Sequence, residues 1–378
     1  MNKRTRPLLI FIIILLIGLF ILFLINKKAS ELSIVAPPEL QDHPIYSQYE
    51  MKRNDSLINI GIQPLYLPTG IILELMKRDN ILNRALSASG KEINYYSFLK
   101  GADVNFFLQK ELLDGGVGGD MPALSASSSF DVLIPVIIQK GNASIVSVGP
   151  MLTNDLKGKR IAYPYGSISH YYILDLLHSS GIPENRVSLI PMEVSAMAKA
   201  LHNNEIDLFS AWEPTVIEAL KQYPEYYITY QKITTGYLYF SKAFVQKNPE
   251  IVNHILAAVI RSISWMKSDR ENLRLACEWN LKAMEELTGD KSNLNAEEIA
   301  DVALKDILRY HSKSSIVLND EELRINSSLH KEYDFLRALS GKTKNSNWEQ
   351  VAKSFDNDLM KEILSHPQVF HLNDYDYN

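Results

Sequence analysis

Cysteine is almost absent from this chain, which has one, Cys277, among 378 residues. A single cysteine cannot form an internal disulfide, and it excludes cysteine-rich zinc and iron–sulfur sites. Cys277 lies within a helical pattern, where a lone cysteine is typical of an apolar core. An excess of positive charge is also lacking, because the formal net charge is -5, so nothing favours binding to nucleic acid. With 46% hydrophobic residues the chain is an ordinary folded protein, which excludes disordered and collagen-like classes.

Recognisable catalytic motifs are lacking as well. The run Gly115–Asp120 superficially suggests a nucleotide loop, but the third glycine of GxGxxG would fall at Met121. Gly158-Lys159-Arg160 lacks the spacing of a phosphate-binding P-loop, and HExxH and GxSxG do not occur. The histidines are scattered and are typical of packed or surface positions rather than of metal ligands: His170, His178 and His202. The sequence therefore predicts no catalytic residue, no metal site and no cofactor, and hence no enzyme.

One long apolar run is present. Leu8 to Ile25 is unbroken and is flanked by basic residues, so a helix over it, at about 1.5 Å per residue, would span most of a bilayer core. A cleaved signal peptide is the alternative, but the run is long for one, and Pro37-Pro38 follows the best small-residue site. No second run of this length occurs. The sequence thus predicts a cytoplasmic tip and anchor over residues 1–28, with the remainder outside the cytoplasm.

The rest of the chain alternates strands and helices. Residues 29–55 contain three prolines and are typical of a linker. From residue 56 onward, apolar strands and helical patterns follow each other in two series, separated by a break near residues 149–155. Such alternation predicts βαβ units on a mostly parallel sheet. We therefore expect an α/β protein of two lobes, with residues 56–148 and 238–378 in lobe 1 and residues 149–237 in lobe 2.

Individual elements follow from the same patterns. Val132 to Gln139 and Ser144 to Val148 are predicted as separate strands, and Asn248-Pro249-Glu250 as a strong helix start. Further predicted strands are 57–62, 92–96, 159–163, 187–191 and 206–210. Further predicted helices are 71–78, 103–111, 167–179, 195–202 and 213–220, with additional helices continuing toward residue 365.

Four strand-end loops are candidate binding loops, since ligands of open α/β sheets bind beyond the carboxyl ends of strands. They are 63–69, 118–121, 163–170 and 210–214. Gly166-Ser167 should present free backbone N–H groups and a helix dipole, which favours a sulfonate, carboxylate or phosphate. Simple helix capping is the alternative there. For Trp212 the alternative role is packing in the core of a lobe, and for Asp120 it is a turn or a helix cap.

These segments resemble one known family. Residues 96–101 and QKELLDGGVGGDMP (109–122) resemble the first-lobe pattern of extracytoplasmic substrate-binding proteins. DLKGKRIA (155–162) with Gly166-Ser167 resembles the opening of their second lobe, and AWEP (211–214) resembles their WEP segment. In order and spacing, the chain is similar to ABC-importer binding proteins of the nitrate, sulfonate, taurine and thiamine-precursor type. It departs from them at 71–78, which lack the usual Ala and Gly, and beyond about residue 300.

The resemblance implies a type II periplasmic-binding fold, with an N-terminal anchor and extra C-terminal helices added here. It also implies two crossing strands, near 144–149 and 228–239. The partners implied are a small anionic or zwitterionic ligand, together with an ABC permease and ATPase at the bacterial cytoplasmic membrane. The ligand-binding residues implied are Gln63, Tyr66, Asp120, Tyr163, Gly166, Ser167, His170, Trp212 and Glu213. Among them, Gly166 and Ser167 would hold the anionic end, Trp212 would stack on the ligand and Glu213 would pair with an amine.

Two other functions fit the same fold. An uncleaved anchor favours a sensory or adaptor ectodomain that signals through a partner. A small-acid lyase would need an acid–base pair, which the sequence does not offer. The family's pyrimidine-synthase branch relies on a cysteine-rich motif that this chain lacks.

Overall fold

The computed structural model describes residues 40–307, 316–339 and 346–377. The apolar run from Leu8 to Ile25, predicted to be a membrane anchor, lies outside these ranges. In the part of the chain that is described, no helix has the length and apolar character needed to cross a bilayer. The chain divides into two compact units, and the boundary between them lies between Tyr49 and Glu50. Residues 40–49 contain two short 3-10 turns, and all strands and α-helices below belong to the second unit.

Eight strands of the described residues form one sheet, in the order β2-β1-β3-β8-β4-β7-β5-β6. β1 is parallel to β2 and β3, and β5 is parallel to β6 and β7, as the alternating pattern predicted. We call β1–β3 with their helices the first lobe and β5–β7 with theirs the second lobe; the predicted residue boundaries of the lobes remain a prediction. The strands are β1 Leu57–Ile62, β2 Glu92–Ser97, β3 Gly115–Gly119, β4 Val132–Val148, β5 Arg160–Tyr163, β6 Ser188–Pro191, β7 Leu208–Trp212 and β8 Tyr226–Ser241.

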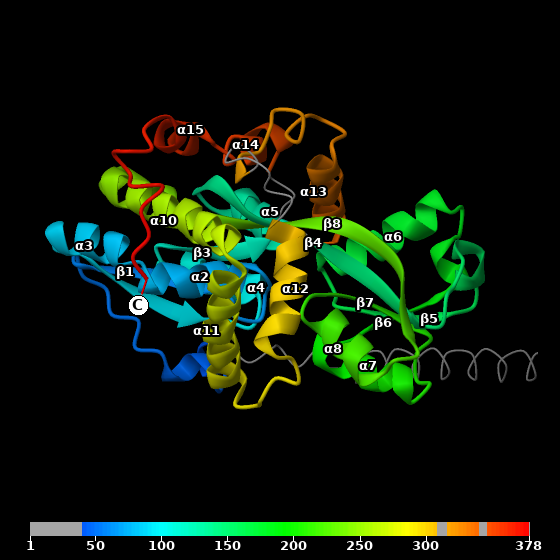
Figure 1. The fold of residues 1–378 in the computed structure, drawn as a ribbon. Coiled ribbons are helices and arrows are strands. Elements are labelled where there is room, and N and C mark those ends of the chain that lie inside the picture. The colour runs from blue at the N-terminus through cyan, green and yellow to red at the C-terminus, as the bar shows by residue number, and fades with distance from the viewer. Residues whose placement is uncertain (1–39, 308–315, 340–345, 378) are drawn as a thin grey trace, which may run out of the picture. The chain divides into compact units, whose positions relative to one another are not determined.

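Two long antiparallel strands, β4 and β8, join the lobes and run side by side (Figure 1). Their pairing extends from Val132 opposite Ser241 to Val148 opposite Tyr226. The prediction of separate strands at 132–139 and 144–148 was wrong in this respect. Lys140, Gly141 and Asn142 interrupt the apolar pattern, but they stay in the ladder because β8 pairs with them where the chain passes between lobes. The predicted second crossing, at 228–239, lies within β8.

Helices cover the sheet and extend beyond it. α4 and α5 pack on β3, and α6, α7 and α8 pack on β7. In the second lobe, two apolar clusters lie on the two faces of the sheet, one around Phe209 and Val216 and one around Ile173 and Leu208. The helices are α2 Thr69–Arg78, α3 Asn80–Ala88, α4 Gly101–Gln109, α5 Asp120–Ser129, α6 Ile168–Ser179, α7 Val194–His202, α8 Thr215–Gln222, α9 Lys242–Lys247, α10 Pro249–Ser268, α11 Arg270–Thr288, α12 Ala296–Ile307, α13 Ser328–Leu339, α14 Trp348–Ala352 and α15 Asp358–Ser365.

The C-terminal helices contact both lobes. α12 packs on α11 and on β4, and its Glu298 forms an ion pair with Lys221 of α8 at 2.7 Å. α13 packs on α5 of the first lobe and on α6 of the second (Figure 1). Because α5 and α6 both begin at predicted ligand-binding residues, the position of α13 bears directly on the site.

Candidate functional site

The first-lobe part of the site is built at the end of β1. The chain leaves the strand at Ile62, and Gln63 donates a hydrogen bond from Nε2 to the carbonyl oxygen of Val117 at 2.6 Å. Tyr66 is buried in the same loop, and burial together with the nearby Asp120 carboxylate raises the pKa of its phenol well above the usual value. The loop is thereby fixed against β3 and turned toward the start of α5.

Asp120 is the first residue of α5 and is only 3% exposed. Its Oδ2 accepts hydrogen bonds from the Thr234 hydroxyl at 2.9 Å and from the Thr235 N–H at 2.8 Å, and its Oδ1 accepts one from the Tyr237 hydroxyl at 3.2 Å. Burial raises the pKa of this carboxyl to about 6, although the three hydrogen bonds oppose the shift. Asp120 therefore ties the first lobe to the middle of the crossing strand β8.

The second-lobe part of the site is the start of α6. Gly166 has a φ of +72°, a left-handed conformation that glycine adopts without strain. Ser167 then caps the helix: its Oγ accepts from the N–H of His170 at 3.3 Å and donates to the Pro164 carbonyl oxygen at 2.6 Å. Helix geometry leaves the next two N–H groups, of Ile168 and Ser169, without an acceptor inside the helix. Both residues are buried, so this end of α6 is a buried patch of positive potential.

Aromatic rings surround that helix start. The rings of Tyr163 and His170 stack at 4.3 Å between centroids, and Phe335 of α13 meets His170 edge-on at 5.1 Å. The Gly166 N–H donates to Nδ1 of His170 at 3.3 Å, which places the imidazole proton on Nε2 and keeps the ring neutral. Burial lowers the pKa of His170 to about 4, in agreement with this arrangement. The four predicted residues of this loop, Tyr163, Gly166, Ser167 and His170, thus come together.

The two remaining predicted residues lie at the end of β7. Trp212 is partly buried and stands opposite Ala143 of β4 in the sheet register. Glu213 accepts a hydrogen bond at Oε2 from the Ile217 N–H at 2.9 Å, and burial raises the pKa of its carboxyl to about 7, with Lys305 of α12 acting in the opposite direction. In the part of the chain that is described, Glu213 bonds to Ile217 and Trp212 pairs with Ala143, and neither contacts the other seven predicted residues by a hydrogen bond or ring contact.

Sequence reasoning missed several residues that build the middle of the site. Gln139 of β4 accepts a hydrogen bond at Oε1 from the Thr69 N–H at 3.0 Å, which fixes the start of α2 at the crossing. The Tyr172 hydroxyl donates to the carbonyl oxygen of Ile233 in β8. Glu332 of α13 is buried beside these groups. Of these residues, only Tyr172 could have been proposed from the sequence, because it follows Gly166-Ser167 by little more than one helical turn. Gln139 and Glu332 reach the site through contacts between residues that are distant in sequence.

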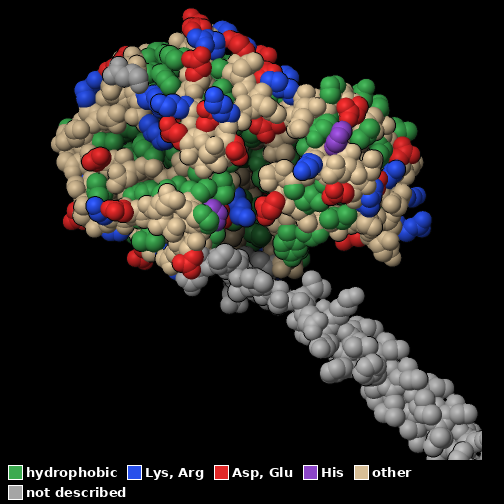
Figure 2. Space-filling view, turned by 90° about the horizontal axis from the view of Figure 1, so that it is seen from below, with side chains coloured by type: hydrophobic (Ala, Val, Ile, Leu, Met, Phe, Trp, Pro, Cys, Tyr) green, Lys and Arg blue, Asp and Glu red, His purple; other side chains and the backbone are tan. Residues whose placement is uncertain are grey.

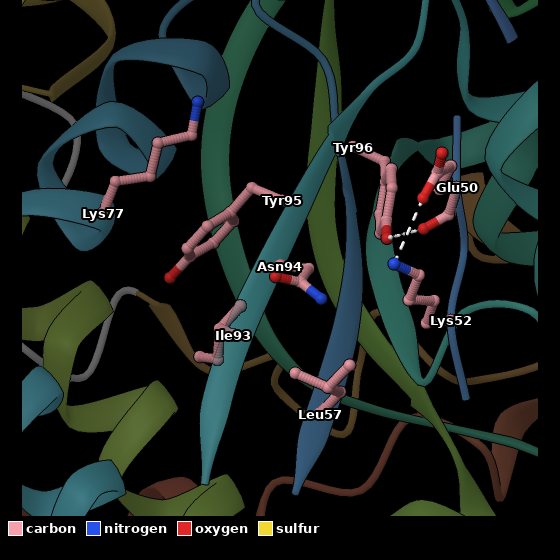
Figure 3. Close-up of a pocket in the computed structure, with 8 residues that line it drawn as sticks. All are labelled: Glu50, Lys52, Leu57, Lys77, Ile93, Asn94, Tyr95 and Tyr96. Carbon is pink, nitrogen blue, oxygen red and sulfur yellow. Dashed lines mark hydrogen bonds and ion pairs between the residues drawn. The ribbon is translucent and has the colours of Figure 1, made fainter. Parts of the chain in front are cut away.

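Two surface hollows of the first lobe are not lined by any predicted ligand residue. One, of about 550 Å³, lies along β2 and is lined by Tyr95, Tyr96 and Lys77 among others (Figure 3). At its rim Lys52 and Glu50 form an exposed ion pair at 3.2 Å. The other, of about 730 Å³, lies near Arg53 and Phe244. Figure 2 shows a hollow in one face of the molecule, with acidic and basic side chains at its edge.

Metal binding has no support in the described ranges, where no group of three or more His, Cys, Asp or Glu residues comes together. Cys277 is buried in α11 and burial raises the pKa of its thiol to about 12, which is typical of a packed, unreactive cysteine.

Known proteins resemble this chain both in sequence and in fold. Residues 139–272 match a family model described as NMT1/THI5 like. The taurine-binding periplasmic protein of Escherichia coli (strain K12) is 26% identical over 188 residues, which is 47% of this chain and 58% of that protein. The crystal structure of the periplasmic aliphatic sulphonate binding protein SsuA from Escherichia coli matches with a TM-score of 0.57 at 16% identity, over 79% of this chain and 100% of that one. The periplasmic nitrate-binding protein NrtA from Synechocystis PCC 6803 matches with a TM-score of 0.56 at 15% identity, over 83% and 89%.

The fold is therefore that of periplasmic binding proteins such as SsuA and NrtA. Residues 139–272 match the NMT1/THI5 like model, and the resemblance stated from the sequence is confirmed. The relatives named here are described as binding proteins and not as enzymes, which agrees with the prediction of no enzymatic activity. The sequence match covers little more than half of the taurine-binding protein.

Proposed function

We propose that this chain is a solute-binding protein that captures a small sulfonate-type anion or zwitterion between its lobes and delivers it to an ABC importer. The start of α6 carries the proposal. There the buried N–H groups of Ile168 and Ser169 face no acceptor within the helix, and the helix dipole adds positive potential. An anionic oxygen is the group that such a site favours.

The surroundings of α6 support an organic ligand over a bare inorganic ion. The stacked Tyr163 and His170 rings offer apolar surface beside the helix start. Asp120 in the first lobe and Glu213 in the second add acidic groups, which suit an amine at the far end of the ligand. A ligand that contacts both lobes would stabilise their closed arrangement by hinge motion about β4 and β8.

The proposed location is the outer face of a bacterial cytoplasmic membrane. The basic residues before Leu8 favour a cytoplasmic N-terminus, and the apolar run to Ile25 would tether the binding unit near its permease and ATPase. The periplasmic relatives support the extracytoplasmic side of this proposal.

The test is calorimetric titration of the full chain, in mild detergent, with taurine, ethanesulfonate, nitrate and a hydroxymethylpyrimidine. We compare wild type with Ser167→Asp and Ser167→Asn, which have the same shape and are both good helix caps. A carboxylate at this position should weaken sulfonate binding by about tenfold or more through charge repulsion at close range, whereas the amide should preserve it. Binding of none of the four compounds by folded wild type would refute the proposed ligand class. Equal affinities of the two variants would refute the proposed position of the anion.

A further inference from the structure

Helix α13 brings one buried carboxylate to the site from a region outside the resembling segments. Glu332 is 3% exposed, and its Oε1 accepts a hydrogen bond from the Ser328 hydroxyl at 3.2 Å. Its Oε2 is fully buried, and no group in the described residues donates a hydrogen bond to it. A buried carboxylate oxygen without a donor is costly in a folded protein, which suggests that something else fills this role.

The neighbours of Glu332 are acidic or aromatic. Asp120 interacts with it electrostatically from α5, and the phenols of Tyr172 and Tyr237 interact with it from α6 and β8. The nearby cation, Lys232, already forms an ion pair with Asp175. Burial and Asp120 raise the pKa of the Glu332 carboxyl well above its ordinary value. The cluster therefore holds two buried carboxyl groups with two tyrosine phenols beside them, and its nearby lysine is already paired with Asp175.

The same face of α13 reaches the start of α6. Phe335 lies three residues after Glu332 and so on the same side of the helix, about 4.5 Å along its axis. Its ring meets His170 at 5.1 Å, and His170 accepts the hydrogen bond of Gly166. One face of α13 thus contacts the loop at the helix start proposed for an anion and also carries the unpaired carboxylate, one helical turn away. A ligand that reached both would need an anionic group and a cationic group joined by a short chain.

We propose that Glu332 is a further ligand-binding residue and that it pairs with a cationic group on the ligand, so that the preferred ligand class is the amino-sulfonate zwitterion. This inference rests on the proposed function, since it assumes that a sulfonate binds at α6. It assigns to the C-terminal helices the third wall of the site, beside the two lobes.

The experiment compares taurine with ethanesulfonate, which has the same carbon chain and sulfonate but no amine. Wild-type protein should bind taurine at least about tenfold more tightly, because a hydrogen bond to a charged group is at stake. Glu332→Gln should remove most of this preference by weakening taurine, with ethanesulfonate affected less than about twofold. Glu349→Gln, which removes an exposed carboxylate paired with Lys353 on α14, is the control and should alter neither affinity.

The results distinguish a failure of this inference from a failure of the proposed function. If wild type binds both sulfonates equally, the inference is wrong while the proposed function stands, and this readout needs no variant to fold. If Glu332→Gln keeps the preference for taurine, Glu332 does not contact the amine. If wild type binds neither compound, the proposed function falls, and the inference falls with it.

Discussion

The neutral, buried histidine at the start of α6 allows a quantitative test of the site's construction. His170 accepts the Gly166 N–H at Nδ1 and lies between the rings of Tyr163 and Phe335. Protonation would place a second proton on Nδ1, break this hydrogen bond and bury a charge. Burial accordingly lowers the pKa of His170 from 6.5 to about 4.

The sign and size of the effect follow from proton linkage. Between about pH 6.5 and about pH 4 the unfolded chain binds a proton at this imidazole and the folded chain does not, so the free energy of unfolding falls as the pH falls. Over the whole interval the loss amounts to about 3 kcal/mol. Below about pH 4 both states are protonated and the loss stops growing.

The assay is urea unfolding followed by tryptophan fluorescence, between about pH 7 and about pH 4. We compare wild type with His170→Asn, which keeps an acceptor near Nδ1, and with His170→Phe, which keeps a ring. Neither variant titrates here, so wild type should lose about 3 kcal/mol more than each of them over this interval, whatever their stabilities at neutral pH. Curves that run parallel for wild type and both variants would refute the neutral buried imidazole.

Three further predictions concern stability. Arg261 and Asp79 form an ion pair at 2.7 Å, and both side chains are 1% exposed. Arg261→Met should therefore lower the free energy of urea unfolding by about 3–5 kcal/mol, and adding Asp79→Asn should restore part of this loss. An unchanged free energy of unfolding would contradict the buried pair. Burial raises the pKa of Glu213 to about 7, so the stability that its proton contributes is present below about pH 4.5 and is lost as the pH rises through about 7. Glu213→Gln should therefore be as stable as wild type at about pH 4.5 and about 1–3 kcal/mol more stable at about pH 8. A variant less stable than wild type at about pH 8 would contradict the raised pKa. Asp120→Asn replaces one acceptor oxygen by an N–H donor that faces β8. It should lower the free energy of unfolding by about 1–3 kcal/mol, measured as a lower thermal midpoint. An unchanged midpoint would argue against the three hydrogen bonds of the Asp120 carboxylate.

Local patterns were sufficient where one stretch of sequence determines its own structure. The glycine in a left-handed turn, the serine cap and the helix after them could be predicted from Gly166-Ser167, because all the interactions involved lie within four residues. The parallel strands around β1 and β5 could be predicted for the same reason, since alternation with helices is itself the signal.

Long-range register was not accessible in this way. The Asp120 carboxylate meets Thr234 and Tyr237 only because β8 returns across the sheet after more than a hundred residues. The continuity of β4 through Lys140 to Asn142 depends on its partner strand and not on its own apolar pattern. Glu332 had no motif to mark it, and only the packing of α13 against α5 and α6 brings it to the site.

Hydrogen–deuterium exchange of the full chain, with and without saturating taurine, tests the central claim most directly, because it reports both binding and its location. The account predicts slower exchange in two separate segments, the start of α6 over residues 163–171 and the first-lobe loop over residues 63–70, since a ligand between the lobes contacts both. Unchanged exchange in both segments, or protection confined to the first-lobe hollow lined by Tyr95 and Tyr96, would contradict it.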